Sequence, residues 1–234
     1  MSTAATSSPL GVGLYSVTEV ASLARLQPSR VRRWVKGYSF SDRSGQRRQA
    51  RPLFRRDLPP AAGRIVLTFV DLVEVLFVSA FLKHGVSLSS VRRAAEVGSE
   101  MFETTHPFCV SRFETDGRSI FARITDEVDE EHLLDLVRRQ AVFKQVFNPL
   151  LRQLDYDQVT GDAIRWWPLG KARPVVVNPR LSFGAPITAQ SSVPTRVLYA
   201  AHAAGEPPEA IADWHRAPLD EVLAAIEFER ARAA

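Results

Sequence analysis

The N-terminal part of the chain contains Tyr15-Ser-Val-Thr-Glu-Val-Ala-Ser-Leu-Ala-Arg-Leu-Gln-Pro-Ser-Arg-Val-Arg-Arg-Trp-Val-Lys-Gly37, a stretch with the signals of two consecutive helices. Ser16 stands three residues before Glu19, the spacing of a capping box, in which each side chain satisfies an exposed amide at a helix start. Pro28 suits the first position of a second helix, where its missing N–H costs nothing, and Gly37 is placed to end it. Two short helices joined by a tight turn predict a helix-turn-helix.

The second of these helices is expected to be amphipathic. Val31, Trp34 and Val35 recur at helical spacing and predict the face that packs inward. The opposite side carries one hydroxyl and four cations, which suits a helix that reads DNA. We therefore expect DNA contacts from Ser29, Arg30, Arg32, Arg33 and Lys36.

A basic hairpin is expected directly after Gly37. Tyr38–Phe40 and Pro52–Phe54 have the composition of short strands, and residues 41–51 between them form a polar, arginine-rich loop. A basic hairpin beside a recognition helix is a wing, suited to phosphate or minor-groove contact. The candidate contacts on the wing are Arg43, Arg47, Arg48 and Arg51.

Charge is strongly segregated along the chain. Between Arg25 and Arg56 there are eleven Lys and Arg residues against one acid, Asp42, in a protein whose total net charge is only +4. Such segregation indicates a polyanionic partner. The alternative, a face that is merely solvated, usually mixes the two signs.

The most apolar stretch, residues 65–82, predicts a buried helix. It has about the length of a membrane span, but Asp71 and Glu74 lie near its middle, where charge is costly in lipid. Thr68 and Asp71 supply a start signal, and the pattern continues to His84. A further helix is expected from Ser87 to about residue 102. No membrane contact is expected.

A hairpin and a long helix are expected in the middle of the chain. Residues 107–113 and 119–124 resemble two strands joined by a turn at Asp116-Gly117. An amphipathic helix, kinked at Pro149, is expected over residues 130–154. Its stripe suits either packing or dimerisation, because operator readers usually pair two half-sites. The stripe consists of Leu133, Leu134, Val137, Val142, Val146 and Leu150.

Three short helices are expected at the C-terminal end, over Thr195–His202, Pro208–His215 and Pro218–Arg230. From Val193 onward there are four arginines against seven acids, and a net negative charge is unfavourable beside phosphates. This part of the chain is therefore interpreted as a protein-binding or oligomerising module.

Enzymatic, metal-binding and cofactor-binding motifs are absent from the sequence. The single cysteine, Cys109, excludes an internal disulfide and fits a cytoplasmic protein. The five histidines show no metal-ligand spacing, and single histidines are usually surface or hydrogen-bonded core residues. No dinucleotide, Walker or nucleophile-elbow motif occurs. We expect no catalytic, metal or cofactor site.

Two resemblances extend this interpretation. The run from Tyr15 to Trp34, with residues 67–78 and 84–94, resembles the winged helix of MerR-type regulators, although the cysteines that such regulators use to sense metals are absent. Asn178-Pro-Arg-Leu-Ser-Phe-Gly-Ala-Pro-Ile187 with Val193-Pro-Thr-Arg196 resembles a small bacterial domain that occurs in antitoxins paired with PIN-like ribonuclease toxins. Together they resemble the larger type II antitoxins of the VapB class.

The resemblance implies a role in a toxin–antitoxin module. The head would bind operator DNA of its own operon as a homodimer, and the rest would hold a PIN-like ribonuclease inactive. Phe228, Arg230 and Arg232 are the candidate toxin contacts, because clustered carboxylates in such nucleases attract a cation. Two alternatives stay open: a stand-alone MerR-like regulator that senses a small ligand, and a protein-interaction adaptor.

The expected fold is mainly α with some β structure. It has a disordered leader over residues 1–13, a winged helix-turn-helix over 14–66, a helical dimerisation and linker region with a β-hairpin over 67–172, and a three-helix domain over 173–234.

Overall fold

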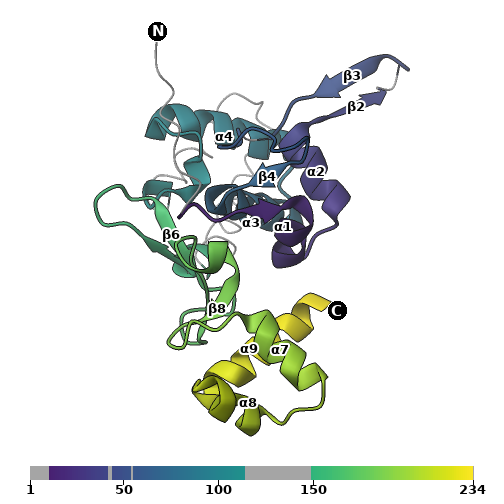
Figure 1. Cartoon of the computed structure of the whole chain (residues 1–234). Coiled ribbons are helices and arrows are strands. Elements are labelled where there is room, and N and C mark those ends of the chain that lie inside the picture. Colours follow the sequence, from purple (N-terminus) through teal and green to yellow (C-terminus); the bar gives the residue numbers. More distant parts are fainter. Residues whose placement is uncertain (1–10, 42–43, 54, 114–148, 234) are drawn as a thin grey trace. The chain divides into compact units, whose positions relative to one another are not determined.

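The computed structural model describes residues 11–41, 44–53, 55–113 and 149–233. By its internal contacts the chain divides into two compact units (Figure 1). The HTH unit consists of Ser16–Ala163, and the C-terminal unit consists of Ile164–Ala234 together with Met1–Tyr15. The fold is mixed α and β, with an N-terminal helix-turn-helix and a helical C-terminus.

The helix-turn-helix forms where the local signals predict it. Strand β1, Tyr15–Ser16, leads into α1, Val17–Ala24, and the Ser16–Glu19 capping box is present with both of its hydrogen bonds. Arg25 ends α1 in a left-handed conformation, and α2, Pro28–Lys36, has Pro28 in its first turn. Helix α1 packs against both α2 and α3. These outcomes confirm the first two predicted helices.

The hairpin after α2 is present, but its second strand was placed wrongly. Strand β2, Tyr38–Ser41, pairs in antiparallel fashion with β3, Arg47–Ala50, so that Tyr38 lies opposite Ala50 and Ser41 opposite Arg47. The second strand was expected over Pro52–Phe54, but the strand that pairs with β2 lies at Arg47–Ala50, within the segment expected to be a loop. Leu53 is buried, and its amide donates to the carbonyl of Trp34 (N···O 2.7 Å), which ties this part of the chain to α2.

The core of the HTH unit lies around α3. Strand β4, Val66–Leu67, precedes α3, Phe69–Lys83, and α4, Leu88–Phe102, follows it. Thr68 and Asp71 cap α3, and Ser87 caps α4, as predicted. Phe77, Phe81 and Phe108 pack ring against ring within this core. Among the described residues, no helix is long and apolar enough to cross a membrane.

The middle of the chain departs from expectation where it is described. Residues 107–113 were expected as a strand, but Pro107–Cys109 form a 3-10 turn, η1, and Val110 makes an isolated bridge to Asp162. The predicted partner strand over residues 119–124 lies outside the described residues. So does most of the helix expected over 130–154; its described part is helical at residues 149–152, and its last residue, Leu154, begins strand β5, Leu154–Tyr156.

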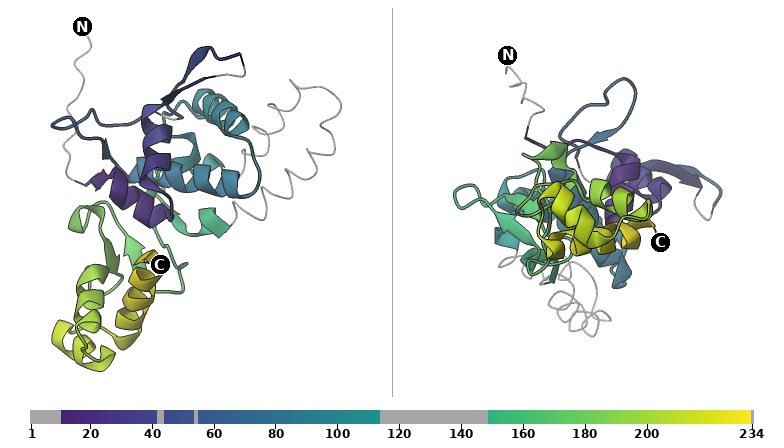
Figure 2. Two further views of the ribbon diagram at one scale, coloured as in Figure 1. Left: turned by 90° about the vertical axis from the view of Figure 1, so that its right-hand side faces the viewer. Right: turned by 60° about the horizontal axis from the view of Figure 1, so that its bottom comes forward.

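The C-terminal unit joins a small sheet to three helices (Figure 2). Strand β6, Ala163–Trp166, pairs with β7, Val175–Val177, which pairs with β8, Pro186–Thr188, all antiparallel, and a short turn, η3, Ser182–Gly184, lies between β7 and β8.

Three helices complete the C-terminal unit, and all three were predicted. They are α7, Thr195–Ala203, α8, Pro208–His215, and α9, Leu219–Ala233. Helix α9 packs on both of the others. Leu198, Ile211 and Val222, one from each helix, lie in the core between them.

Gly184 fixes the approach of the N-terminal segment to this sheet. The hydroxyl of Tyr15 donates to the Gly184 carbonyl (O···O 2.7 Å), and the Leu14 amide donates to the carbonyl of Phe183. A Cβ on Gly184 would lie 2.2 Å from the Tyr15 hydroxyl, and its φ of +85° also disfavours other residues. The Phe183-Gly184 step therefore holds residues 14–15 against η3 within the C-terminal unit.

Candidate nucleic-acid interface

Helix α2 presents a polar, cationic face opposite a buried apolar one. Val31, Trp34 and Val35 are at most 5% exposed and hold the helix against the rest of the HTH unit. The predicted contact residues are all exposed: Ser29, Arg30, Arg32, Arg33 and Lys36. Spacings of three and four residues place Ser29, Arg32, Arg33 and Lys36 on the same side of the helix. The helix is therefore anchored by one face and free to present the other.

Arg33 is held in place by an aromatic neighbour. Its guanidinium carbon lies 4.0 Å from the centre of the Tyr38 ring, which belongs to β2. Such cation–π stacking limits the rotamers of the arginine without satisfying its N–H donors. The contact joins the recognition helix to the wing, so that one element orients a cation of the other.

The wing carries its cations on two faces. Arg47 and Arg48 are both exposed in β3, and successive side chains of a strand point to opposite sides. The exposed Arg51 follows the hairpin, and its carbonyl accepts a hydrogen bond from Arg92 Nη2 (3.0 Å). Arg43, the remaining predicted wing contact, lies outside the described residues. Figure 1 shows the hairpin projecting beside α2.

Replacing Arg47, Arg48 and Arg51 with alanine together should reduce DNA affinity about equally for all sequences. Each phosphate contact releases counterions, so the slope of log affinity against log salt should flatten by about two to three units. Fluorescence anisotropy over a range of salt concentrations measures this slope. An unchanged slope together with lost sequence preference would instead place the wing on base edges.

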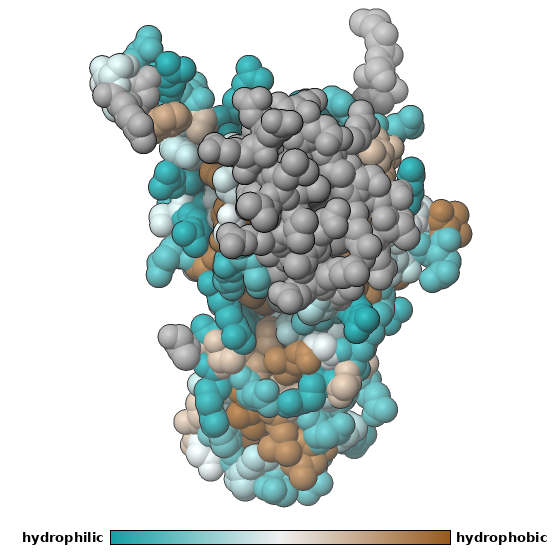
Figure 3. Space-filling model, turned by 180° about the vertical axis from the view of Figure 1, so that it is seen from behind, coloured by the Kyte–Doolittle hydropathy of each residue, from teal (hydrophilic) through white to brown (hydrophobic). Residues whose placement is uncertain are grey.

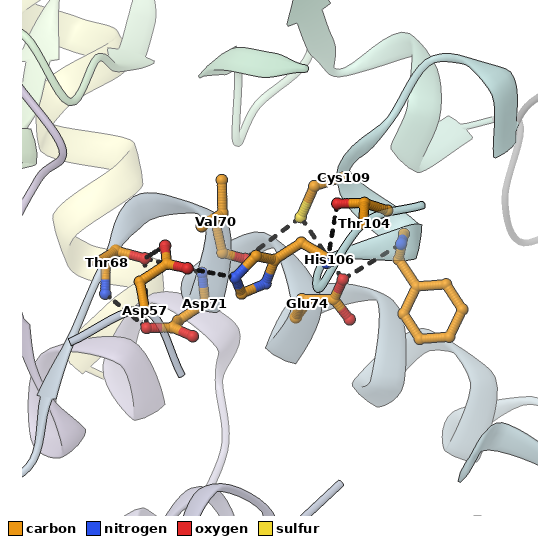
Figure 4. Close-up of polar contacts among 9 residues, drawn as sticks. Asp57, Thr68, Val70, Asp71, Glu74, Thr104, His106 and Cys109 are labelled. Atoms are coloured by element: carbon orange, nitrogen blue, oxygen red, sulfur yellow. Dashed lines mark hydrogen bonds and ion pairs between the residues drawn. The ribbon is translucent and has the colours of Figure 1, made fainter. Parts of the chain in front are cut away.

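The HTH unit also contains a largely buried polar cluster that sequence patterns do not reveal (Figure 4). Asp57 precedes β4, Asp71 and Glu74 lie on α3, and His106 and Cys109 lie at η1. His106 Nε2 is 2.7 Å from Asp57 Oδ1, and the Thr68 hydroxyl is 3.0 Å from Asp57 Oδ2. These bonds anchor the segment that follows the wing to the core, across 49 positions of sequence in the case of His106.

Burial and charge shift the pKa values of this cluster. Burial raises the pKa of Glu74 to about 8 and that of Asp71 to about 6. Burial alone would lower the pKa of His106, but its hydrogen bond to Asp57 and the nearby carboxylates outweigh that effect and raise it. Burial also raises the pKa of the Cys109 thiol well above its ordinary value, which makes it a poor nucleophile.

The free energy of unfolding of the HTH unit should fall as the pH rises from 6 to 8. The folded-state pKa of Glu74 is above its unfolded value, so the folded state binds the extra proton, and stability is lost as pH rises toward 8. The raised pKa of His106 acts in the same direction, because its contribution is present below its unfolded pKa and is lost above its folded one. Ionisation of Glu74 alone should cost about 2 kcal/mol over this range.

Urea denaturation at several pH values tests this expectation. Glu74→Gln keeps the shape without the titration, so its stability should change less with pH than that of the unmodified chain. Glu100→Gln, at an exposed position of α4, is the matched control and should leave the pH dependence unchanged. Equal pH dependence in both variants would contradict the role given to Glu74.

The three predicted toxin contacts all lie on the last helix of the chain. Helix α9 continues to Ala233 and includes Arg230 and Arg232. Phe228 is 3% exposed, and Arg232 pairs with Glu229 and lies over the Phe228 ring. Only Arg230 of the three is exposed. The helix therefore extends three residues beyond its expected end at Arg230, because Ala, Glu and Arg are strong helix formers that continue it.

Helix α9 also exposes two apolar residues, one of which lines a hollow together with Arg230. Leu219 and Leu223 are 39% and 48% exposed. Leu223, Arg230 and His202 line a hollow of about 550 Å³ on the C-terminal unit. Figure 3 shows brown, apolar surface in the lower part of that view, where this unit lies. Val222 belongs to the core between the three helices, and Ile226, also part of that core, borders the hollow.

The described residues hold no group of three or more His, Cys, Asp and Glu side chains arranged to bind a metal ion. His106 is the hydrogen-bonded core histidine described above, while His84 is exposed and its Nδ1 lies 2.9 Å from the carbonyl of Ala80. Both positions fit the structural roles expected of single histidines.

Comparisons with known proteins find a helix-turn-helix domain in the N-terminal part of the chain and a similar protein over most of its length. A family model described as "Putative DNA-binding HTH domain" matches residues 13–95. A Mycobacterium tuberculosis protein named "Putative antitoxin VapB45" is 24% identical over 227 residues, which cover 92% of this chain and 93% of that protein. The crystal structure of Rv2018 from the same organism matches with a TM-score of 0.73 at 22% identity, covering 93% of this chain and 99% of that one, which shows a shared fold. The N-terminal part of the chain therefore matches a family of DNA-binding helix-turn-helix domains. Over most of its length the chain is similar to a protein named as an antitoxin.

Proposed function

We propose that this protein is the DNA-binding antitoxin of a type II toxin–antitoxin module. It binds the operator of its own operon and neutralises a PIN-like ribonuclease. The observation that carries the DNA-binding part is the exposed cationic face of α2, backed by the buried Val31, Trp34 and Val35. The name of the Mycobacterium tuberculosis relative supports the antitoxin part.

The DNA-binding surface combines two kinds of contact. Helix α2 enters the major groove, where Arg30, Arg32 and Arg33 reach base edges and phosphates. The β2–β3 wing follows the backbone, and Arg47 and Arg48 on its two faces contact phosphates on either side. Two copies of the chain bind two half-sites of the operator, which makes the active form a homodimer.

The toxin-binding surface is the exposed face of α9. Leu219 and Leu223 supply apolar contact area, and Arg230 supplies the cation. A nuclease of the PIN-like type holds metal ions with clustered carboxylates, so a cation presented at its cleft is attracted to that site. Phe228 and Arg232 support this face from within the helix rather than contacting the toxin, because Phe228 is buried and Arg232 is paired with Glu229.

Two experiments test the proposal directly. The full chain is titrated against the DNA upstream of its own gene in a gel shift, with an unrelated fragment of equal length as the control. It is also co-expressed with the product of the adjacent gene, and growth is compared with that of cells expressing the adjacent gene alone. A neighbour that is not toxic, or a chain that does not restore growth, would reject the antitoxin function.

A stand-alone regulator that senses a small ligand is the second candidate function. The observation that favours it is a hollow beside the wing with cationic and apolar walls. An isolated gene with a divergent operator would support this candidate over the antitoxin.

A further inference from the structure

A hollow of about 870 Å³ lies in the HTH unit between α4 and the segment that follows the wing. This segment can be followed in Figure 1 from the end of β3 past α4. Small-molecule sites in proteins usually have volumes of roughly 300–1,000 Å³, so the hollow is large enough for an organic ligand. Neither the recognition helix surface nor the buried Glu74 cluster accounts for it.

The described lining of the hollow is strongly cationic. Four arginines border it: Arg51, Arg55, Arg56 and Arg92. One acid, Glu96, lies among the described residues of the lining, and Arg93 on the same helix is within 3.6 Å of its carboxylate. An excess of positive charge around a hollow favours a negatively charged occupant.

Two of these arginines have buried N–H groups without a partner. Arg56 Nη1 and Arg92 Nε make no hydrogen bond to any described part of the chain, so a small turn of either side chain toward an acceptor in the hollow breaks no hydrogen bond at these atoms. Another nitrogen of the Arg92 guanidinium, Nη2, donates to the Arg51 carbonyl (3.0 Å) and orients the group. Buried donors are costly to leave unsatisfied, and the oxygens of a carboxylate, sulfonate or phosphate are their best acceptors.

Most of the remaining lining is apolar, with hydroxyls from Ser99, Thr104 and Thr105. The apolar walls are formed by Val35, Pro52, Leu53, Leu58, Pro59, Ala95 and Pro107. A phosphate or sulfate ion alone would leave these walls in contact with water. An occupant with an apolar body beside its anionic group covers the walls and satisfies the arginines together.

From this geometry we infer that the hollow beside the wing is a binding site for an amphipathic organic anion, with the acidic group on Arg56 and Arg92 and an aromatic or aliphatic body against Leu53, Leu58 and Ala95. The DNA phosphodiester backbone does not fit this description, because it has no comparable apolar body.

The position of the site couples it to DNA binding. Val35 belongs to α2, Arg51 follows β3, and the bond from Arg92 to Arg51 joins α4 to the base of the wing. An anion at this point adds negative charge beside the wing, so it opposes the attraction of DNA phosphates. This coupling, unlike the site itself, rests on the proposed function of the chain as a DNA-binding protein.

Anilinonaphthalenesulfonate is a suitable probe, because it combines a sulfonate with aromatic rings and fluoresces when its rings leave water. The full chain should give a saturable fluorescence increase with one site per chain. Phenylnaphthylamine, which has the rings without the sulfonate, should bind more weakly, and inorganic sulfate should compete poorly. Equal affinity for the charged and neutral probes would overturn the assignment of an anion site.

Substitutions locate the bound probe. Arg56→Met and Arg92→Met keep the apolar stems and remove the N–H donors, so each should weaken anilinonaphthalenesulfonate about tenfold or more and alter phenylnaphthylamine little. Ser99→Phe fills the hollow from α4 and should block both probes. Arg64→Met, at an exposed position outside the lining, is the control and should change neither.

Two outcomes would contradict the proposed anion site. Unchanged probe binding in Ser99→Phe would place the probe elsewhere, and equal loss of both probes in the Met variants would mean that the arginines do not select charge. Circular dichroism of each variant establishes that it is folded, and Arg56→Met serves as the second test if Arg92→Met unfolds.

The effect of the bound anion on DNA binding is measured separately. Saturating anilinonaphthalenesulfonate should weaken binding of DNA carrying a red fluorescent label about fivefold, and this effect should vanish in Ser99→Phe. If the chain binds no DNA at all, the proposed function fails while the probe titrations still decide the anion site. If DNA binds equally with and without the probe, the coupling is wrong.

Discussion

Replacing Arg30, Arg32, Arg33 and Lys36 with alanine in the full chain should lower the affinity for operator DNA by at least about 100-fold. All four side chains are exposed on α2, and each base or phosphate contact contributes about 1–3 kcal/mol. Arg33→Ala alone should cost about 1–3 kcal/mol and relax base preference at one position of the site. Gel shifts with the operator and with single-base variants of it measure both effects.

The fold should survive this fourfold change. Val31, Trp34 and Val35, which hold α2 in place, are untouched, and alanine is the best helix former. The matched control removes four exposed cations from outside α2 and the wing. These are Arg64, Lys83, Arg93 and Arg180. If the control loses as much affinity as the α2 variant, general charge and not the recognition helix determines binding.

Elements with local signals could be predicted from the sequence. The capping boxes at Ser16 and Thr68 place the starts of α1 and α3, and Pro28 places the start of α2. Such signals work because the hydrogen bonds or backbone constraints involved lie within a few residues of each other. The three C-terminal helices were predictable for the same reason, since each begins within two residues of a proline.

Elements that depend on distant partners could not be placed in this way. Strand β3 reads Arg-Arg-Gln-Ala and has no strand signature, but pairing with β2 fixes it. The more strand-like Pro52-Leu53 is drawn into the core instead, because Leu53 packs beneath α2 and donates to Trp34. Residues 107–113 were mistaken for a strand because their apolar side chains fill the aromatic core around Phe77.

The candidate sites, too, could be predicted where they depend on local sequence and not where they depend on contacts between distant residues. The exposed side of α2 follows from helical periodicity, so its five polar residues could be identified without a structure. The His106–Asp57 bond joins residues far apart in sequence, and the hollow beside the wing is bordered by three separate segments. Burial also revises the C-terminal assignment, because no sequence pattern distinguishes the buried Phe228 from the exposed Leu223 on the same helix.

Charge reversal on α9 should separate toxin neutralisation from DNA binding. Leu223→Asp with Arg230→Glu places two negative charges where the proposed surface must meet a carboxylate-rich cleft, so affinity for the toxin should fall by at least about 100-fold. Both positions are exposed, and the core residues Val222 and Ile226 beside them are unchanged. Co-expression with the adjacent gene should then arrest growth, while a gel shift of the same variant should still show operator binding.

Point substitutions test the toxin-binding surface more cleanly than a truncation of the chain, because they leave the fold of the C-terminal unit intact. Ending the chain after Pro174 would remove β7 and β8 and the Gly184 carbonyl that Tyr15 contacts, so the remaining part of the C-terminal unit would lose its core. Arg196→Glu, at an exposed position of α7, is the control for the reversal of charge at Arg230 and should neutralise the toxin normally. Normal growth with the α9 variant, when the toxin alone is lethal, would place the neutralising surface outside α9.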